Sequence, residues 1–184
     1  YLTLGNENYE MPDMPVGSEE GILHGLYNFK QLVHDKKHPH VNILASGSLV
    51  NEAVQAQSDL SELYSINSTI WCVTNYKRLR EDALEKDRDY LLHPNKPRKK
   101  SYLEKTLAKA QGPFIAVSDN MKLVSDQISK WIPGGLFSLG TDGFGRSDTR
   151  ENLRKFFEVD KKMIVLASII QLRDRKDITQ TVFD

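Results

Sequence analysis

The sequence has 184 residues, of which 39% are hydrophobic, so it is long enough to form one domain with a buried core. Its 25 Lys and Arg residues equal its 25 Asp and Glu residues. This balance argues against general nucleic-acid binding and against steady adhesion to an anionic membrane, because both need excess positive charge. No run of about 18 apolar residues is present, so we expect no membrane-spanning helix.

The first seventeen residues are typical of a linker. Residues 1–4 form a short strand-like run, and residues 5–17 include Pro12 and Pro15, which fix φ and lack a backbone donor. We therefore place residues 1–17 as a linker from an upstream domain and residues 18–184 as a single α/β domain. The start within a strand-like run, without Met, is typical of a fragment or of a trimmed chain.

The rest of the sequence alternates between strand-like and helix-like segments. The expected strands are 26–33, 41–45, 69–74, 114–117 and 137–139. The expected helices are a short one that begins at Ser18, the segments 49–64, 76–92, 101–110 and 118–131, and one that begins at Asp148. The apolar run 163–170 is expected to be a buried helix. Ser101 and Glu104 form a capping-box pattern. This alternation predicts a three-layer α/β/α domain with a mostly parallel five-stranded sheet, in which strand 26–33 is an antiparallel edge strand.

Cys72 is the only cysteine, so no intrachain disulfide can form. It lies in the apolar run 70–73, and we expect a buried, unreactive thiol rather than a nucleophile. Cysteine usage of this kind fits a reducing, cytosolic compartment.

The turn Ser46-Gly47-Ser48 joins an expected strand to an expected helix. Free backbone N–H groups at such a junction can bind an anion. The turn lacks both the P-loop and the dinucleotide-binding glycine patterns, so a tight turn with a serine cap is the plainer interpretation. Ser46, Gly47 and Ser48 are thus weak candidates for an anion site.

The glycine-rich stretch 140–148 is the most distinctive part of the sequence. Asp142-Gly143 resembles the start of the thiamine-diphosphate motif, but Thr141 replaces its first glycine, and residues 163–173 lack the Asn that should close it. We therefore expect no cofactor or metal site here. The stretch is better suited to a protein interface. The interface candidates are Asp142, Phe144, Arg146, Ser147 and Asp148.

Two further polar clusters have plain interpretations. His34, His38 and His40 share one turn, but their spacing matches no zinc motif, so a solvated turn is favoured over a metal contact. Residues 96–100 are strongly basic and are interpreted as a solvated loop, with a docking surface for an acidic partner as the alternative. His93 either caps a helix or approaches a partner domain.

Residues 140–160, which begin Gly-Thr-Asp-Gly-Phe-Gly-Arg-Ser-Asp, closely resemble the C-terminal domain of the homodimeric pyruvate dehydrogenase first component. The opening residues 1–15, residues 19–22, residues 44–49 and the Leu-His-Pro at 92–94 resemble the same family, so the resemblance covers nearly the whole chain.

This resemblance implies a role within a larger bacterial, cytoplasmic enzyme that is similar to transketolase. Such an enzyme decarboxylates pyruvate and acetylates the lipoyl groups of a dihydrolipoyl acetyltransferase core. Thiamine diphosphate and magnesium would be bound by upstream domains at a homodimer interface, and no catalytic residue carries over to this chain. The domain itself would support dimerisation and assembly. The alternative is a free-standing anion- or nucleotide-binding module that uses Ser46 to Ser48.

Overall fold

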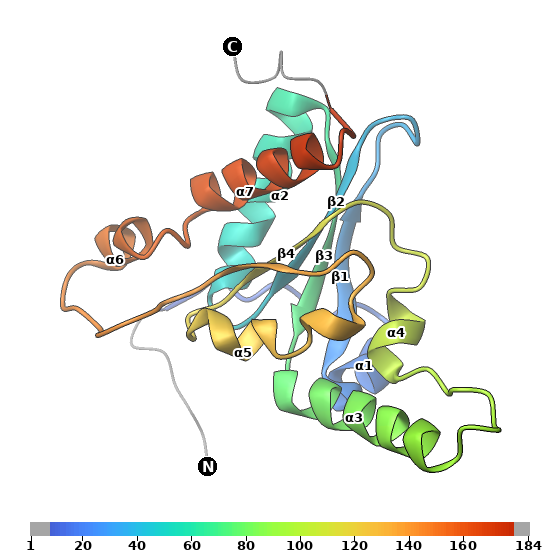
Figure 1. The fold of residues 1–184 in the computed structure, drawn as a ribbon. Helices are drawn as coiled ribbons and strands as arrows, with labels where there is room; N and C mark the ends of the chain where they lie inside the picture. The colour runs from blue at the N-terminus through green and yellow to red at the C-terminus, as the bar shows by residue number, and fades with distance from the viewer. Residues whose placement is uncertain (1–7, 179–184) are drawn as a thin grey trace.

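A five-stranded sheet runs through the middle of the computed structural model, which describes residues 8–178, and helices cover both of its faces (Figure 1). The strands are β1 (Leu26–Leu32), β2 (His40–Ala45), β3 (Asn67–Val73), β4 (Phe114–Val117) and β5 (Phe137–Leu139). The helices are α1 (Glu19–His24), α2 (Leu49–Tyr64), α3 (Tyr76–Leu92), α4 (Tyr102–Thr106), α5 (Lys122–Asp126), α6 (Arg150–Phe156) and α7 (Lys161–Asp174), with a 3₁₀ turn, η1, at Ser129–Trp131.

The sheet has the strand order β1-β3-β2-β4-β5. β2 pairs in parallel with both β3 and β4, and β4 pairs in parallel with β5, whereas β1 pairs antiparallel with β3 at one edge. The expected three-layer α/β/α architecture, including the antiparallel edge strand, is confirmed. Long helical crossovers between neighbouring parallel strands produce this arrangement.

Alternation along the central strand β2 divides the core into two layers. Ile43 faces α2 and α7, whereas its neighbour Leu44 faces the side covered by α3 and α4, and both are fully buried. Ile43, Leu44 and Ala45 form an unbroken apolar run where helices cover both faces of β2, whereas His40 and Asn42 near its start are polar.

Helix α7 confirms the expectation that the apolar run 163–170 is helical. Asp160 caps it, since its side chain accepts a hydrogen bond from the Met163 N–H at 2.9 Å. Ile164, Val165 and Ile169 are buried against the sheet core. On α2, by contrast, Leu63 is 71% exposed.

The single helix expected over 118–131 is wrong, because the chain forms α5 and η1 instead. The Ser118 hydroxyl accepts hydrogen bonds from Asn120 N and Nδ2, at 3.1 and 3.2 Å. This local side-chain turn competes with helix formation, so α5 begins only after Met121.

Other helix ends also differ from the expectations. The capping box of Ser101 and Glu104 is present, but α4 ends at Thr106 rather than at 110. Thr149, not Asp148, is the N-cap of α6, because its side chain accepts from Asn152 N. The Ser18 hydroxyl donates to Pro15 O instead of capping α1.

The expected strand-like run at 1–4 lies outside the described residues, and residues 8–17 form neither helix nor strand. The domain boundary after residue 17 therefore stays a prediction. Within residues 8–178, no helix is both long and apolar enough to cross a bilayer. Cys72 is half-buried, and burial raises the pKa of its thiol, which disfavours formation of the reactive thiolate at neutral pH.

Candidate functional site

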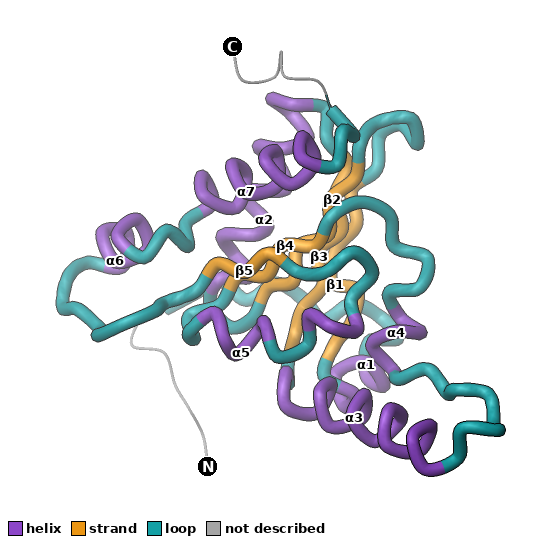
Figure 2. The backbone as a smooth tube through the Cα atoms, in the orientation of Figure 1, coloured by secondary structure: helices purple, strands orange, loops and turns teal. Residues whose placement is uncertain are grey.

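The glycine-rich loop after β5 runs away from the sheet toward α6 (Figure 2). It first passes close to the β4–α5 connection, where Thr141 N donates to Asn120 O at 2.9 Å. A Cβ atom on Gly140 would lie 2.7 Å from the same carbonyl oxygen, so only glycine fits at this crossing. The base of the loop is thus fixed by backbone contacts.

Asp142 is held by the start of α5. Its carboxylate accepts a hydrogen bond from Lys122 N at 3.0 Å and lies 3.6 Å from Lys122 Nζ. A diphosphate motif would use such an aspartate as a magnesium ligand. Here the carboxylate already accepts a hydrogen bond from the first N–H of α5 and pairs with a lysine, so the loop does not fit thiamine diphosphate with magnesium.

The tip of the loop presents Phe144, which is 96% exposed. Two residues on, the Arg146 guanidinium stacks 3.9 Å from the ring centroid of Phe156 on α6. Ser147 is exposed beside them. An exposed phenylalanine next to a pre-positioned arginine has the composition of an interface anchor.

Asp148 holds the backbone of the loop and does not belong to its exposed tip. Its carboxylate accepts hydrogen bonds from Asn152 Nδ2 at 2.9 Å and Thr149 N at 2.6 Å, and these bonds, the Asn152 bond first, lower its pKa. Of the five interface candidates, Phe144, Arg146 and Ser147 are therefore free to meet a partner, while Asp142 and Asp148 hold the backbone.

The turn at Ser46, Gly47 and Ser48 lies where β2 ends, as expected, and Gly47 adopts φ +59°. Ser48 Oγ donates to the Asp119 carboxylate at 2.8 Å. A carboxylate on the turn repels an incoming anion, which weighs against the anion site. The anion site stays a prediction, and the nearby Asp119 carboxylate is unfavourable to it.

A buried ion pair beside this turn was not foreseen from the sequence. Arg154 Nη1 lies 2.8 Å from Glu52 Oε1, and Glu52 Oε2 accepts from Lys161 N at 2.8 Å. The guanidinium also lies 5.8 Å from the ring of Tyr9 in the 8–17 segment. No local signal in the sequence links residues so far apart.

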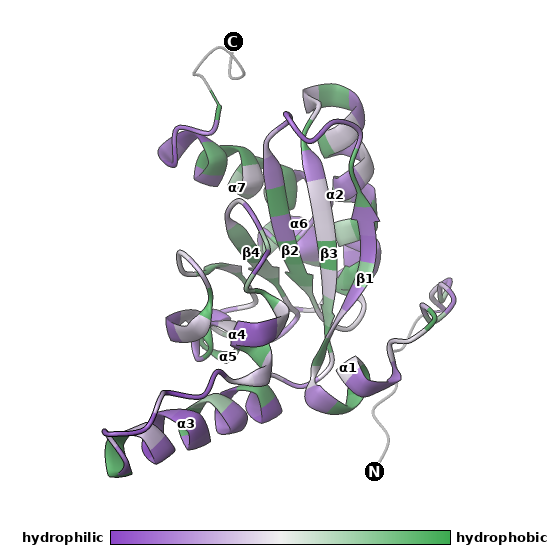
Figure 3. Cartoon of the chain, turned by 90° about the vertical axis from the view of Figure 1, so that its right-hand side faces the viewer, coloured by the Kyte–Doolittle hydropathy of each residue, from purple (hydrophilic) through white to green (hydrophobic). Residues whose placement is uncertain are grey.

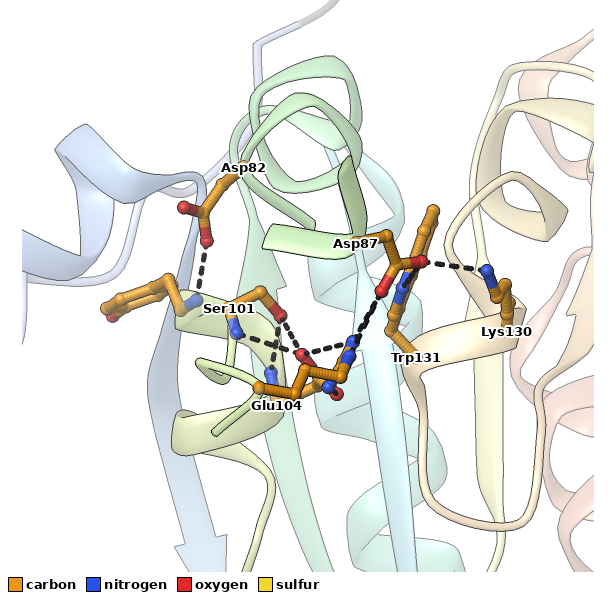
Figure 4. A network of polar contacts seen from close by, with 8 residues as sticks. Asp82, Asp87, Ser101, Glu104, Lys130 and Trp131 are labelled. Atoms are coloured by element: carbon orange, nitrogen blue, oxygen red, sulfur yellow. Dashed lines mark hydrogen bonds and ion pairs between the residues drawn. The ribbon is translucent and has the colours of Figure 1, made fainter. Parts of the chain in front are cut away.

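The basic segment 96–100 is partly tied to the domain. Arg98 pairs with Asp87 of α3 and with Glu104 of α4, at Nη2–Oδ1 and Nη1–Oε1 distances of 2.7 Å. Figure 4 shows these two carboxylates within one network of polar contacts. Asp87 also accepts from Lys130 Nζ at 2.7 Å and Trp131 Nε1 at 3.0 Å. Arg98 is therefore a structural link between two helices.

Hydrogen bonds from Lys130 and Arg98 lower the pKa of Asp87 to about 2. Burial acts to raise the pKa of Glu104, but bonds from Arg98 and Ser101 outweigh it and the net pKa is lowered. Both carboxylates remain charged throughout the neutral range.

The histidines make local contacts. His34 Nε2 pairs with Ser61 Oγ, His40 Nε2 lies 2.9 Å from Thr69 Oγ1, and His93 Nδ1 lies 3.1 Å from both Asp89 O and Asp89 Oδ1 at the end of α3. Over residues 8–178, no set of three His, Cys, Asp or Glu side chains is arranged to hold a metal ion.

Comparison with known proteins places this architecture in a family. The family model described as the transketolase-like TK C-terminal domain matches residues 25–160. The chain is 44% identical to the pyruvate dehydrogenase E1 component of Pseudomonas aeruginosa and 38% identical to that of Escherichia coli (strain K12), each over 99% of this chain. It spans only 21% and 20% of the length of these two relatives.

Solved structures show the same fold. A transketolase from Campylobacter jejuni superposes with a TM-score of 0.54 at 18% identity, covering 83% of this chain and 19% of that one. A transketolase from Pichia stipitis gives 0.54 at 19% identity, covering 91% and 21%. The resemblance to the pyruvate dehydrogenase first component is confirmed, and the chain belongs to the transketolase-like C-terminal domain family.

Proposed function

We propose that this chain is the C-terminal domain of a thiamine-diphosphate-dependent pyruvate dehydrogenase (acetyl-transferring), which decarboxylates pyruvate and acetylates lipoyl groups. The observation that carries the proposal is 44% identity over 99% of the chain to a protein named pyruvate dehydrogenase E1 component. Because the chain spans about a fifth of that relative, the activity belongs to a longer natural chain.

Within that enzyme, the domain contributes assembly surface and no catalytic residue. The exposed Phe144 and the stacked Arg146 support a contact with the enzyme's own upstream domains or with the second copy in a homodimer. The complete enzyme would work in the bacterial cytoplasm with a dihydrolipoyl acetyltransferase core as its partner.

Thiamine diphosphate and magnesium would be bound by parts of the enzyme outside this sequence. The engagement of Asp142 with Lys122 supports this division, because the loop that most resembles a cofactor motif has no free carboxylate. The residues of this domain would then stabilise its fold and form its contacts with the rest of the enzyme.

The test compares the natural full-length chain with residues 1–184 alone. Calorimetry with magnesium and thiamine diphosphate, and an assay of pyruvate decarboxylation, should give binding and turnover only for the full-length chain. Tight, magnesium-dependent binding of the cofactor by residues 1–184 would contradict the proposed division. A full-length chain that binds the cofactor but leaves pyruvate unchanged would contradict the proposed activity.

A further inference from the structure

One half of a sheet face is open. The helices that cover the side opposite α2 and α7 lie toward the carboxyl ends of the parallel strands, and Figure 3 shows the other half of β1, β2 and β3 without a helix in front. A groove of about 900 Å³ lies there. Its size is within the range of pockets that hold nucleotide-sized molecules.

A β-bulge places polar side chains on the floor of this groove. Asn28 pairs with Trp71 and Gln31 pairs with Thr69, so Phe29 is an extra residue in β1. Without the bulge, strict alternation would turn Gln31 away from the face that Asn28 occupies. With it, both amides line the groove.

The deeper floor is held by hydrogen bonds within the protein. The indole N–H of Trp71 donates to Asn42 Oδ1 at 3.0 Å, and Asn42 Nδ2 donates to Gln111 O at 2.7 Å. His40 Nε2 lies 2.9 Å from Thr69 Oγ1. His38, on the rim, has a buried Nδ1 without a hydrogen-bond partner within the described part of the chain. The floor is therefore rigid and polar before any ligand binds.

Every ionisable side chain that lines the groove is basic. The lining includes Lys36 from the β1–β2 connection and Lys109 from the segment after α4, together with His38 and His40, and its described residues include no Asp or Glu. Burial lowers the pKa of His40, which disfavours the charged form of its ring. Neither lysine has an acidic partner within residues 8–178.

We propose that this groove binds a small organic anion, with its phosphate or carboxylate groups at Lys36 and Lys109 and a hydrogen-bonding body over Asn28 and Gln31. Two unpaired positive charges across a polar floor are complementary to such a molecule. In a chain with no net charge, the gathering of unpaired lysines at one groove is a local feature and does not follow from composition.

The test uses the natural full-length chain, titrated by calorimetry with inorganic phosphate, citrate, adenosine monophosphate and adenosine triphosphate. At least one probe should bind, and the double variant Lys36→Gln/Lys109→Gln should weaken that binding by about tenfold. Lys37→Gln/Lys105→Gln is the matched control, since both lysines are exposed neighbours outside the groove, and it should change binding by less than about twofold. Citrate and the phosphates distinguish the two anion chemistries.

Amine labelling read by mass spectrometry locates the bound probe. The probe should protect Lys36 and Lys109 and leave Lys37 and Lys105 reactive. Binding that is insensitive to Lys36→Gln/Lys109→Gln would overturn the proposal, and so would protection of both lysines in the probe-free chain, because another segment would then cover the groove. Lysine-dependent capture of a hexaglutamate peptide, without binding of any small probe, would also overturn it and assign the groove to an acidic peptide.

Discussion

Arg154 and Glu52 form an ion pair with an Nη1–Oε1 distance of 2.8 Å, although they lie 102 residues apart in the sequence. Their side chains are only 14% and 11% exposed. The pair joins the first turn of α2 to α6, and the second oxygen of Glu52 extends the link to the start of α7 through Lys161 N.

Removing one partner of this pair should leave an uncompensated charge in a largely buried place. We expect Arg154→Met to lower the free energy of unfolding by about 3 kcal/mol. Urea unfolding measures this change. Arg175→Met is the control, because its pair with Asp177 is 43% and 37% exposed, and its effect should be below about 1 kcal/mol. Equal effects of the two substitutions would contradict the structural role of Arg154.

The network around Asp87 should give stability a dependence on acid pH. The pKa of Asp87 falls from an ordinary value of 3.8 to about 2, chiefly through hydrogen bonds from Lys130 and Arg98. The stabilisation that ionised Asp87 gives the folded state is therefore complete above the pKa of Asp87 in the unfolded chain, and it is lost as pH falls toward 2. Asp87→Asn should cost about 1 kcal/mol at pH 7, and the difference from wild type should shrink from about pH 4 downward.

The control for this prediction is Glu81→Gln on the same helix, whose pair with Lys77 is 53% and 82% exposed. It should change stability little at any pH. Urea unfolding at several pH values compares the two variants. A difference between Asp87→Asn and wild type that persists unchanged to pH 2 would show that the charge of Asp87 has no stabilising role.

Two glycines with nearly the same backbone conformation should respond very differently to alanine. Gly112 has φ +84° and Gly143 has φ +83°. A Cβ atom on Gly112 would lie 1.7 Å from His40 O, whereas one on Gly143 would meet nothing within 4 Å. Gly143→Ala should cost about 1 kcal/mol from backbone strain alone, and Gly112→Ala about 3 kcal/mol or more. Comparable melting temperatures for both variants would contradict the close approach at Gly112.

Phe144 should matter for association and not for folding. Because it is 96% exposed, Phe144→Ser should leave the unfolding midpoint of the domain unchanged. In the natural full-length chain, it should weaken self-association by about tenfold or more, as measured by analytical ultracentrifugation. Leu63→Ser, which removes a 71% exposed leucine from α2, is the control and should not affect association. If Phe144→Ser left self-association unchanged, the loop would not be part of the dimer interface.

Most of the architecture could be predicted from the sequence because local pattern and tertiary role agree. β-branched and apolar runs such as 41–45 became central strands, and the capping box at Ser101 marked a helix start. The prediction failed over 118–131, where the Ser118 side chain competes with the helix for backbone N–H groups. Propensity carries no information on that local competition.

The candidate site was less predictable because it depends on contacts between distant segments. The composition of the 140–148 loop indicated exposed Phe144 and Arg146, but not that Asp142 is bound by Lys122. The set of β1 side chains that line the open groove depends on a single extra residue, Phe29, in this edge strand. A one-residue register shift leaves no clear trace in a polar strand, so the sequence could not indicate which side chains face the groove.

The contact between Tyr9 and Arg154 has a mechanical consequence for the 8–17 segment. The guanidinium that meets the ring also holds Glu52. A swivel of the segment about Tyr9 would have to slide the ring off a cation whose position is already fixed by a buried carboxylate. One guanidinium therefore links Tyr9 of this segment to the place where α2 and α6 meet.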